Sequence, residues 1–324
     1  MGRKLLLVLV VVALVSGGVG GAYWVATLQV HNTFREAKDL LGKGNIPQAA
    51  ELFEKVYRKR PASAEGLESL VNLCQLSSSL EQKDKSIAFA KDFMSMARTD
   101  ADKARAQYFM GTALLSSGNL PEAAAAFEDV ASNHASSDVA DDALFFLARV
   151  RSQEGKYLDA KQLLQTAIER YPDSNLIAQI YQDFGNANVA LLFSQIPTPT
   201  SEQYSVVSGD TVEGIAKKFR TTPDIIREAN GLPGSAAIRK GNLLKIEKIK
   251  FSIVVSKSKN TLTLLNNGEL FKIYSVGTGR SNSTPVGDFK ITTKMLNPPW
   301  YKPGGGLIPF GDKGNLLGTR WLGI

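Results

Sequence analysis

Three segments of the chain share one pattern, and they decide the fold of its first half: GKGNIPQAAELF at residues 42–53, SSGNLPEAAAAF at residues 116–127 and QEGKYLDAKQLL at residues 153–164. In each segment a glycine is followed five residues later by alanine and nine residues later by phenylalanine or leucine. The successive glycines are 74 and 37 residues apart, and 74 is two periods of 37. Self-similarity at a fixed period of about 20 to 50 residues indicates a repeat architecture. Residues 31–195 are therefore predicted to form a helical repeat array, in which a degenerate unit around Ala88 fills the double gap.

Each unit is predicted to be a helix, a tight turn at the glycine and a second, amphipathic helix. The small alanine lets the paired helices approach closely, and the phenylalanine or leucine four residues later fills the groove between them. The unit at residues 111–130 resembles the tetratricopeptide repeat. That resemblance implies an α-solenoid whose units bury their core against their neighbours and whose concave face binds a protein partner of unknown identity.

Cys74 is the one thiol of the 324 residues. A single cysteine excludes an internal disulfide and a zinc site of the C-x-x-C type. Cys74 lies on an apolar helical face in LESLVNLCQL, without a histidine or basic neighbour to lower its pKa, so we expect a buried structural thiol. His31 and His134 are the two histidines and lack companion ligands, so both are predicted to be structural or solvated. We expect no metal site and no cofactor.

Polar residues after His134 are assigned to helix ends. Ser136, Ser137 and Asp138 are predicted to cap the next helix. The adjacent pair of aspartates at 141–142 is predicted to interact with the dipole of that helix from its first turn, in preference to acting as an acid/base pair.

The basic excess is concentrated at the C-terminal end. The net charge is +7, and residues 196–324 carry 18 Lys and Arg against 9 Asp and Glu. A basic region suits nucleic acid, anionic lipid or an anionic polymer. Because these basic residues are scattered, without the clustered stripe of nucleic-acid-binding proteins, we expect no nucleic-acid partner.

The N-terminus has the features of a membrane-targeting segment. After Arg3 and Lys4 there is no charged residue until Arg35, and residues 5–28 are long enough to span a bilayer. Residues 1–30 are predicted to be an uncleaved, single-pass anchor whose basic end stays in the cytoplasm. A cleavable signal peptide ending near residues 16–18 is the alternative. Both interpretations export the bulk of the chain to the periplasm or cell envelope.

A small module follows the repeats. Residues 196–203, IPTPTSEQ, are rich in Pro and Thr and are predicted to be a linker. Residues 204–247 then show a short strand, a turn with a helix cap at Ser-Gly-Asp-Thr, two helical faces and a closing strand. The opening Y-x-V-x-x-G-D-T-x-x-x-I-A and the ending I-x-x-G-x-x-L-x-I of this segment resemble the lysin motif (LysM).

The LysM resemblance implies a βααβ fold that binds glycans containing N-acetylglucosamine, such as peptidoglycan, in a groove between two loops. Carried onto this sequence, the groove would consist of the following residues: Gly209, Asp210, Thr211, Asn230, Leu232 and Ile238.

The hydrophobic period changes to two at Phe251. Residues 251–279 alternate apolar and polar side chains around a tight turn at Asn266-Asn267-Gly268, which predicts a hairpin. Three motifs accompany these strands: V-G-T-G at residues 276–279, T-P-V-G-D-F-K-I at residues 284–291 and N-P-P-W at residues 297–300. Together they resemble the L,D-transpeptidase catalytic domain, so residues 250–324 are predicted to be the N-terminal part of that domain.

The resemblance to L,D-transpeptidases implies cysteine chemistry. In that family a cysteine activated by histidine attacks a stem-peptide carbonyl, and backbone N–H groups stabilise the oxyanion. This sequence has no Cys after Cys74 and no His after His134. We therefore assign no catalytic residue, place the expected His and Cys beyond Ile324, and expect this polypeptide to be inactive in transpeptidation.

Two interpretations follow for the function. The favoured one is a fragment of a cell-wall cross-linking or remodelling enzyme, an L,D-transpeptidase acting on the stem peptides of peptidoglycan. The alternative is a non-catalytic scaffold that binds peptidoglycan and recruits partners through its repeats. The expected fold class is multidomain: an N-terminal transmembrane helix, an α-solenoid of tetratricopeptide-like repeats, a βααβ LysM module and an incomplete β-rich L,D-transpeptidase domain.

Overall fold

The computed structural model describes residues 25–80, 82–234, 237–279 and 283–324. The chain folds into two compact units. Unit 1 runs to Val254 and also includes Thr263–Tyr274, and unit 2 consists of Val255–Leu262 and Ser275–Ile324.

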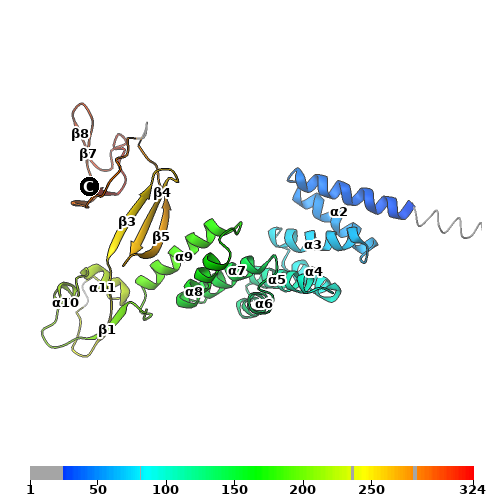
Figure 1. The fold of residues 1–324 in the computed structure, drawn as a ribbon, viewed down its shortest axis with the longest axis horizontal. Helices are drawn as coiled ribbons and strands as arrows, with labels where there is room; N and C mark the ends of the chain where they lie inside the picture. The colour runs from blue at the N-terminus through cyan, green and yellow to red at the C-terminus, as the bar shows by residue number, and fades with distance from the viewer. Residues whose placement is uncertain (1–24, 81, 235–236, 280–282) are drawn as a thin grey trace, which may run out of the picture. The chain divides into compact units, whose positions relative to one another are not determined.

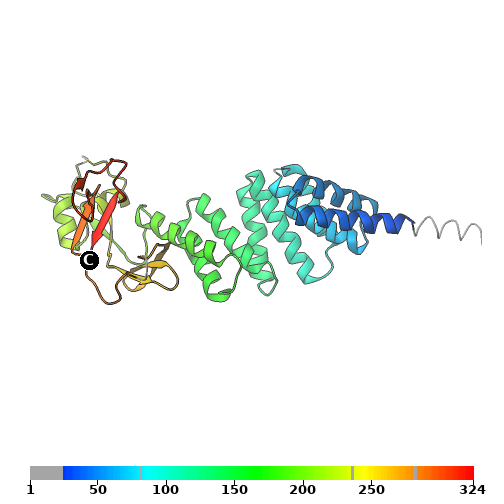
Figure 2. The ribbon, with the colours of Figure 1, turned by 90° about the horizontal axis from the view of Figure 1, so that it is seen from above.

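Unit 1 begins with antiparallel helix pairs, as the repeat pattern predicts. Residues 25–42 are helical and pair with the first labelled helix, and each later helix packs on its neighbours (Figures 1 and 2). The helices are α2 (Ile46–Lys59), α3 (Ala64–Ser79), α4 (Lys83–Met96), α5 (Asp100–Ser117), α6 (Leu120–Asn133), α7 (Ala140–Gln153), α8 (Tyr157–Arg170) and α9 (Ile177–Leu192).

The repeated glycines, alanines and large apolar residues have the predicted roles. Gly44, Gly118 and Gly155 end their helices at φ values of 77°, 84° and 74°, in the left-handed region that suits glycine. The residues five and nine positions later are fully buried in every unit: Ala49, Ala123 and Ala160, and Phe53, Phe127 and Leu164. The predicted α-solenoid is confirmed, because the sequence period sets the core of each repeat.

The degenerate unit keeps the period with different residues. Ala88, the residue singled out in the sequence, is exposed. Ser86 occupies the small position, 37 residues after Ala49, and its hydroxyl hydrogen-bonds the Ser77 hydroxyl at 2.8 Å. Ala90 takes the large position, and Phe89 beside it is buried. The large buried side chain of this unit, Phe89, therefore lies one position before the place that the pattern predicts, and this makes the unit hard to detect in the sequence.

One cap prediction is wrong. Helix α7 has Val139 as its N-cap residue and no side-chain cap. Asp138 instead accepts from the guanidinium of Arg105 at 2.7 Å, in an exposed pair that links α5 to the loop before α7. Asp141 and Asp142 do lie in the first turn of α7, as predicted. Partial burial and the Asp141 charge raise the pKa of Asp142 to about 6.

The predicted βααβ module follows α9. Strand β1 (Ser201–Ser205) pairs antiparallel with β2 (Leu243–Glu247), and the two helices α10 (Val212–Phe219) and α11 (Pro223–Ala229) lie between them in sequence. Tyr204 pairs with Leu244. Strand β1 begins at Ser201, inside the segment expected to be a linker, because residues 201–203 pair with the last three residues of β2.

A buried ion pair joins this module to the end of the repeats. The side chains of Lys245 and Glu247 are 1% and 4% exposed, and Lys245 Nζ lies 2.9 Å from Glu247 Oε1. The same ammonium donates to the carbonyl oxygens of Leu191 and Ser194 at the C-terminal end of α9. The buried Lys245 side chain therefore connects this module to the last helix of the repeats.

The remaining strands form small sheets. Strands β3 (Phe251–Ser256), β4 (Thr261–Asn266) and β5 (Glu269–Ser275) form one sheet in that order, with the predicted hairpin turn at Asn267 and Gly268, which have φ values of 53° and 88°. In unit 2, β6 (Thr293–Leu296) pairs with β9 (Arg320–Gly323), and β7 (Trp300–Tyr301) pairs with β8 (Leu307–Ile308).

The predicted N-terminal anchor lies mostly outside the described residues, which start at residue 25. Among the helices that the structure does describe, none combines the length and the apolar character needed to cross a membrane.

The contact of Gly111 with Phe127 gives a first test of the repeat packing. A Cβ at Gly111 would lie 2.6 Å from the buried Phe127 ring, so Gly111→Ala should lower the free energy of unfolding by about 1–3 kcal/mol. Gly42→Ala is the matched control, because nothing lies within 4 Å of a Cβ there, and it should leave stability equal or slightly higher. Urea unfolding followed by circular dichroism measures both, and equal midpoints would refute the close contact.

The buried ion pair gives a second test. Lys245→Met should cost about 3–5 kcal/mol, because it leaves the Glu247 carboxylate buried without its partner. The double variant Lys245→Met, Glu247→Gln should recover part of this loss in the same urea experiment. Lys248→Met is the control: its partner is Glu202, both side chains are exposed, and the expected change is below about 1 kcal/mol. A Lys245 variant as stable as the Lys248 variant would show that the buried ion pair does not stabilise the fold.

Candidate functional site

The first candidate site is the loop between β1 and α10. Gly209 has a φ of 90° and is exposed, which lets the chain turn sharply there. Thr211 is the N-cap of α10, and its hydroxyl accepts from the Gly214 N–H at 3.0 Å. The side chain of Thr211 therefore supports the loop, although the residue as a whole is exposed.

Asp210 fixes the same loop to β1. Its Oδ2 accepts from the Tyr204 hydroxyl at 2.9 Å and from the Val207 N–H at 2.8 Å. The backbone hydrogen bond from Val207 is the main cause that holds the pKa of Asp210 below its usual range, so the carboxylate stays ionised at neutral pH. Lys218 Nζ lies 4.4 Å from the Tyr204 ring centroid, and Phe219 packs edge-on against that ring.

Asn230 is committed to the interior of the module. Its amide nitrogen donates to the carbonyls of Ile226 and Lys245, and its Oδ1 accepts from the Lys245 N–H. Leu232 and Ile238 are half-buried and pack against the same hydrophobic core. Among the six expected groove residues, Leu232 and Ile238 are the ones whose side chains combine partial exposure with apolar surface.

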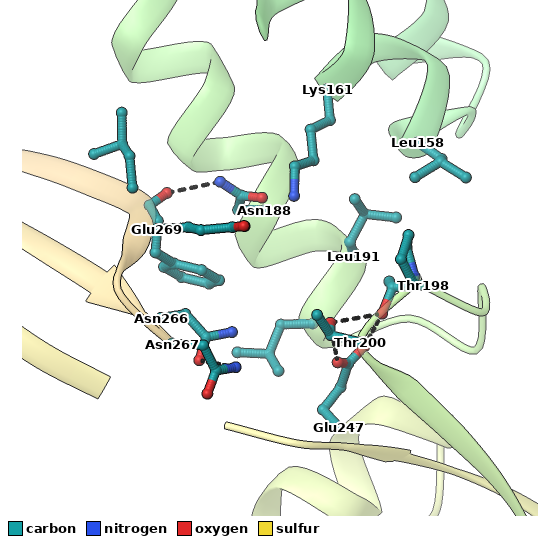
Figure 3. A pocket seen from close by; sticks show the side chains of 14 residues that line it. Leu158, Lys161, Asn188, Leu191, Thr198, Thr200, Glu247, Asn266, Asn267 and Glu269 are labelled. Carbon is teal, nitrogen blue, oxygen red and sulfur yellow. Dashed lines mark hydrogen bonds between the residues drawn. The ribbon is translucent and has the colours of Figure 1, made fainter. Parts of the chain in front are cut away.

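A pocket in unit 1, which the sequence did not predict, has a volume of about 200 Å³ (Figure 3). Its walls come from α8, α9, the 198–200 segment, the end of β2 and the β4–β5 hairpin, and its lining residues are Leu158, Lys161, Asn188, Leu191, Leu192, Thr198, Pro199, Thr200, Glu247, Asn266, Asn267, Glu269, Leu270 and Phe271. Apart from Asn266 and Asn267 in the hairpin turn, no motif marks these residues. They are brought together because the β4–β5 hairpin packs on α9.

Three contacts hold the hairpin against α9. The amide nitrogen of Asn188, a buried residue, donates to the Phe271 carbonyl at 2.9 Å. One turn earlier, Gly185 makes room for the stem of Lys272, because a Cβ at Gly185 would lie 2.6 Å from Lys272 Cγ. The Lys272 ammonium then reaches Asn186 Oδ1 at 2.9 Å.

In unit 2 the structure brings together two of the transpeptidase-like motifs. The Gly279 N–H, at the end of V-G-T-G, donates to Thr284 Oγ1 at 2.7 Å, at the start of T-P-V-G. In the N-P-P-W motif, Asn297 adopts a φ of 51°, and its N–H donates to the Thr319 carbonyl. These bonds order the motif loops, and neither loop contains cysteine or histidine.

Cys74 and the two histidines belong to unit 1, whereas the motif loops belong to unit 2. Cys74 is 3% exposed in α3, as predicted, and burial raises the pKa of its thiol to about 12. His31 Nδ1 lies 3.4 Å from Glu65 Oε1 at the surface, and His134 is the C-cap residue of α6. Among the described residues, no group of three or more His, Cys, Asp or Glu side chains could hold a metal ion.

Family models match three parts of the chain. A model of the L,D-transpeptidase catalytic domain matches residues 250–320, and a LysM domain model matches residues 204–247. A tetratricopeptide repeat model matches residues 34–74, 95–138 and 108–175. All three resemblances predicted from the sequence motifs are confirmed.

Curated relatives point to the same enzyme family. The putative L,D-transpeptidase YkuD of Bacillus subtilis (strain 168) is 34% identical over 127 residues, which cover 37% of this chain and 73% of the relative. YkuD of Bacillus licheniformis is 33% identical over 128 residues, with the same coverage. The putative L,D-transpeptidase YqjB of Bacillus subtilis is 36% identical over 73 residues, 22% of this chain, and the chain spans 40% of its length.

Two solved structures match about half of this chain. A MamA crystal structure is matched over 50% of this chain and 81% of its own, at 22% identity and a TM-score of 0.39. The tetratricopeptide protein TTC0263 of Thermus thermophilus is matched over 50% and 82%, at 15% identity and a TM-score of 0.40.

The burial of Cys74 predicts its reactivity. Because the thiolate is the reactive form, dithionitrobenzoate at pH 8 should modify Cys74 at least about 100-fold more slowly in the native chain than in urea. The denatured chain should release one equivalent of thionitrobenzoate and serves as the control. Stoichiometric labelling of the native chain at the denatured rate would show that the thiol is accessible.

Proposed function

Because the chain belongs to the L,D-transpeptidase family, we propose that it acts at the bacterial cell wall, where its LysM module binds the glycan strands of peptidoglycan. The observation that carries the proposal is the presence of a LysM module directly before transpeptidase-like motifs on one chain. The cell envelope is the location that suits both parts.

In this proposal the glycan contacts come from the two loops of the module. Gly209 and Thr211 are exposed residues of the first loop, and Leu232 and Ile238 offer apolar surface for the face of a sugar ring. Asp210 and Asn230 support the groove without contacting the glycan, because their side chains hold the loop and the strand in place. This division differs from the direct roles expected for all six residues.

The transfer step is proposed from family membership alone. An L,D-transpeptidase needs a thiolate nucleophile near neutral pH, whereas Cys74 is buried and has a pKa raised to about 12. Residues 250–324 contain no cysteine or histidine. We therefore assign none of these residues to acyl transfer.

A second function, a scaffold that binds peptidoglycan and recruits proteins, is favoured by the repeats. The helices from residues 25–42 through α9 form a continuous solenoid, and solenoids of this kind present an extended concave face to partners.

We further propose that residues 1–30 anchor the chain at the cytoplasmic membrane, on the strength of their apolar run, which is uncharged after Lys4.

Binding to purified cell-wall sacculi tests the proposal. The chain should co-sediment with sacculi, and Leu232→Ala should weaken binding about three- to ten-fold, because it removes apolar surface from the groove. Leu243→Ala is the matched control: Leu243 belongs to the same module, is 69% exposed and lies on β2, outside the proposed groove, so its variant should bind as the wild type does.

Circular dichroism and the urea midpoint verify that both variants are folded. A wild-type chain that stays in the supernatant would refute peptidoglycan binding. A folded Leu232 variant with unchanged binding would refute the placement of the groove.

A further inference from the structure

Two charged side chains that line the pocket beside α9, Lys161 and Glu269, form no ion pair among the described residues. Most of its polar side chains are committed: Glu247 accepts from Lys245, Thr198 and Thr200. The two asparagines of the hairpin turn are bonded to backbone groups of residues 248 and 250. The polar groups that take no part in these bonds distinguish the pocket.

Lys161 is the first of these groups. It lies on α8, and its side chain projects into the pocket (Figure 3). Its Nζ lies 5.8 Å from the Phe184 ring centroid, and no carboxylate in the described part of the chain pairs with it. Lys161 is partly buried, and an ammonium group without a counter-ion attracts an anionic group.

Glu269 is the second group. It is the exposed first residue of β5, and Figure 3 shows its side chain beside Asn188. Among the described residues no basic side chain forms an ion pair with Glu269. Asn188 Oδ1 is an additional acceptor, because the amide nitrogen alone is used in the bond to Phe271. This wall therefore presents acceptors for a cationic group that donates hydrogen bonds.

The lining also has an apolar part, and the space is small. Leucines from α8, α9 and β5, together with Phe271, provide the hydrophobic part of the lining. The volume of about 200 Å³ is below the roughly 300–1,000 Å³ that is typical of sites for drug-sized ligands. An occupant must carry one negative and one positive group a short distance apart, with little more than a small apolar side chain.

We infer that this pocket binds a small zwitterion, a free α-amino acid with a short side chain. Lys161 takes the carboxylate, Glu269 and Asn188 Oδ1 take the ammonium, and the leucine wall takes the side chain. Neither the LysM groove nor the transpeptidase-like loops contribute to the site, so the inference does not depend on the proposed function. Its ligand differs in class from both a glycan strand and a stem peptide.

Ligand binding at this position couples to the fold. The walls belong to the last helices of the repeats, the end of the LysM module and the β4–β5 hairpin, so an occupant adds contacts among three segments. A ligand that binds the folded state alone stabilises it by mass action. Bound amino acid should thus raise the melting temperature of the chain.

Titration of the intact chain with glycine, L-alanine and D-alanine tests the inference by calorimetry and by thermal shift. We expect saturable binding of at least one of them. N-acetylalanine, which lacks the ammonium, and alanine amide, which lacks the carboxylate, should each bind at least ten-fold more weakly. Absence of binding by all three amino acids, or equal binding of the blocked analogues, would overturn the inference.

Variants locate the site. Lys161→Met and Glu269→Gln should each weaken binding at least about ten-fold, since each removes one charge-assisted contact. Lys91→Met and Glu228→Gln change exposed residues outside the pocket and are the matched controls. Amino-acid binding that survives both pocket substitutions would overturn the assignment. Sacculus binding should be the same in all four variants, so that a failure here is separable from a failure of the glycan site.

Discussion

The assembly of unit 1 depends on the interactions of the buried Lys245 ammonium with Glu247 and with the end of α9. Removing an ammonium and a carboxylate from water costs several kcal/mol for each ion. Here that cost is offset because Lys245 Nζ forms an ion pair with Glu247 and donates hydrogen bonds to two carbonyls at the end of α9. The Thr198 and Thr200 hydroxyls donate further hydrogen bonds to the Glu247 carboxylate. A cation also suits the negative end of a helix dipole. The same residue uses its backbone N–H and C=O to bind Asn230, so one position fixes strand, helix and loop together.

The sequence predicts the parts of this protein that depend on local chemistry. Glycine at the left-handed helix ends, alanine at the helix contacts and the Asn-Gly hairpin turn each follow from conformational preferences of single residues. Thr211 as a cap belongs to the same class. The degenerate repeat shows the limit: Ser86 and Ala90 keep the period, but neither matches the residue type that the other units use.

Features that depend on long-range packing could not be predicted from the sequence. Lys245 alternates with apolar residues in a strand and has the pattern of a solvent-exposed lysine, whereas the C-terminal end of α9 buries it. Asn230 matches a glycan-binding motif, yet the structure uses its amide to close the module. Lys161, Asn188 and Glu269 are separated by 27 and 81 residues and have no common motif. Their proximity follows from the close approach of β5 to α9.

The joint between α9 and β2 also has a mechanical consequence. A glycan strand held by the module would pull on β1 and β2, and the antiparallel pairing of those strands passes the tension along the sheet to Lys245 and Glu247. The repeat array then receives the load through carbonyl groups at a helix terminus. If the module binds glycan as proposed, a load on the strand would therefore reach the solenoid at the C-terminal end of α9.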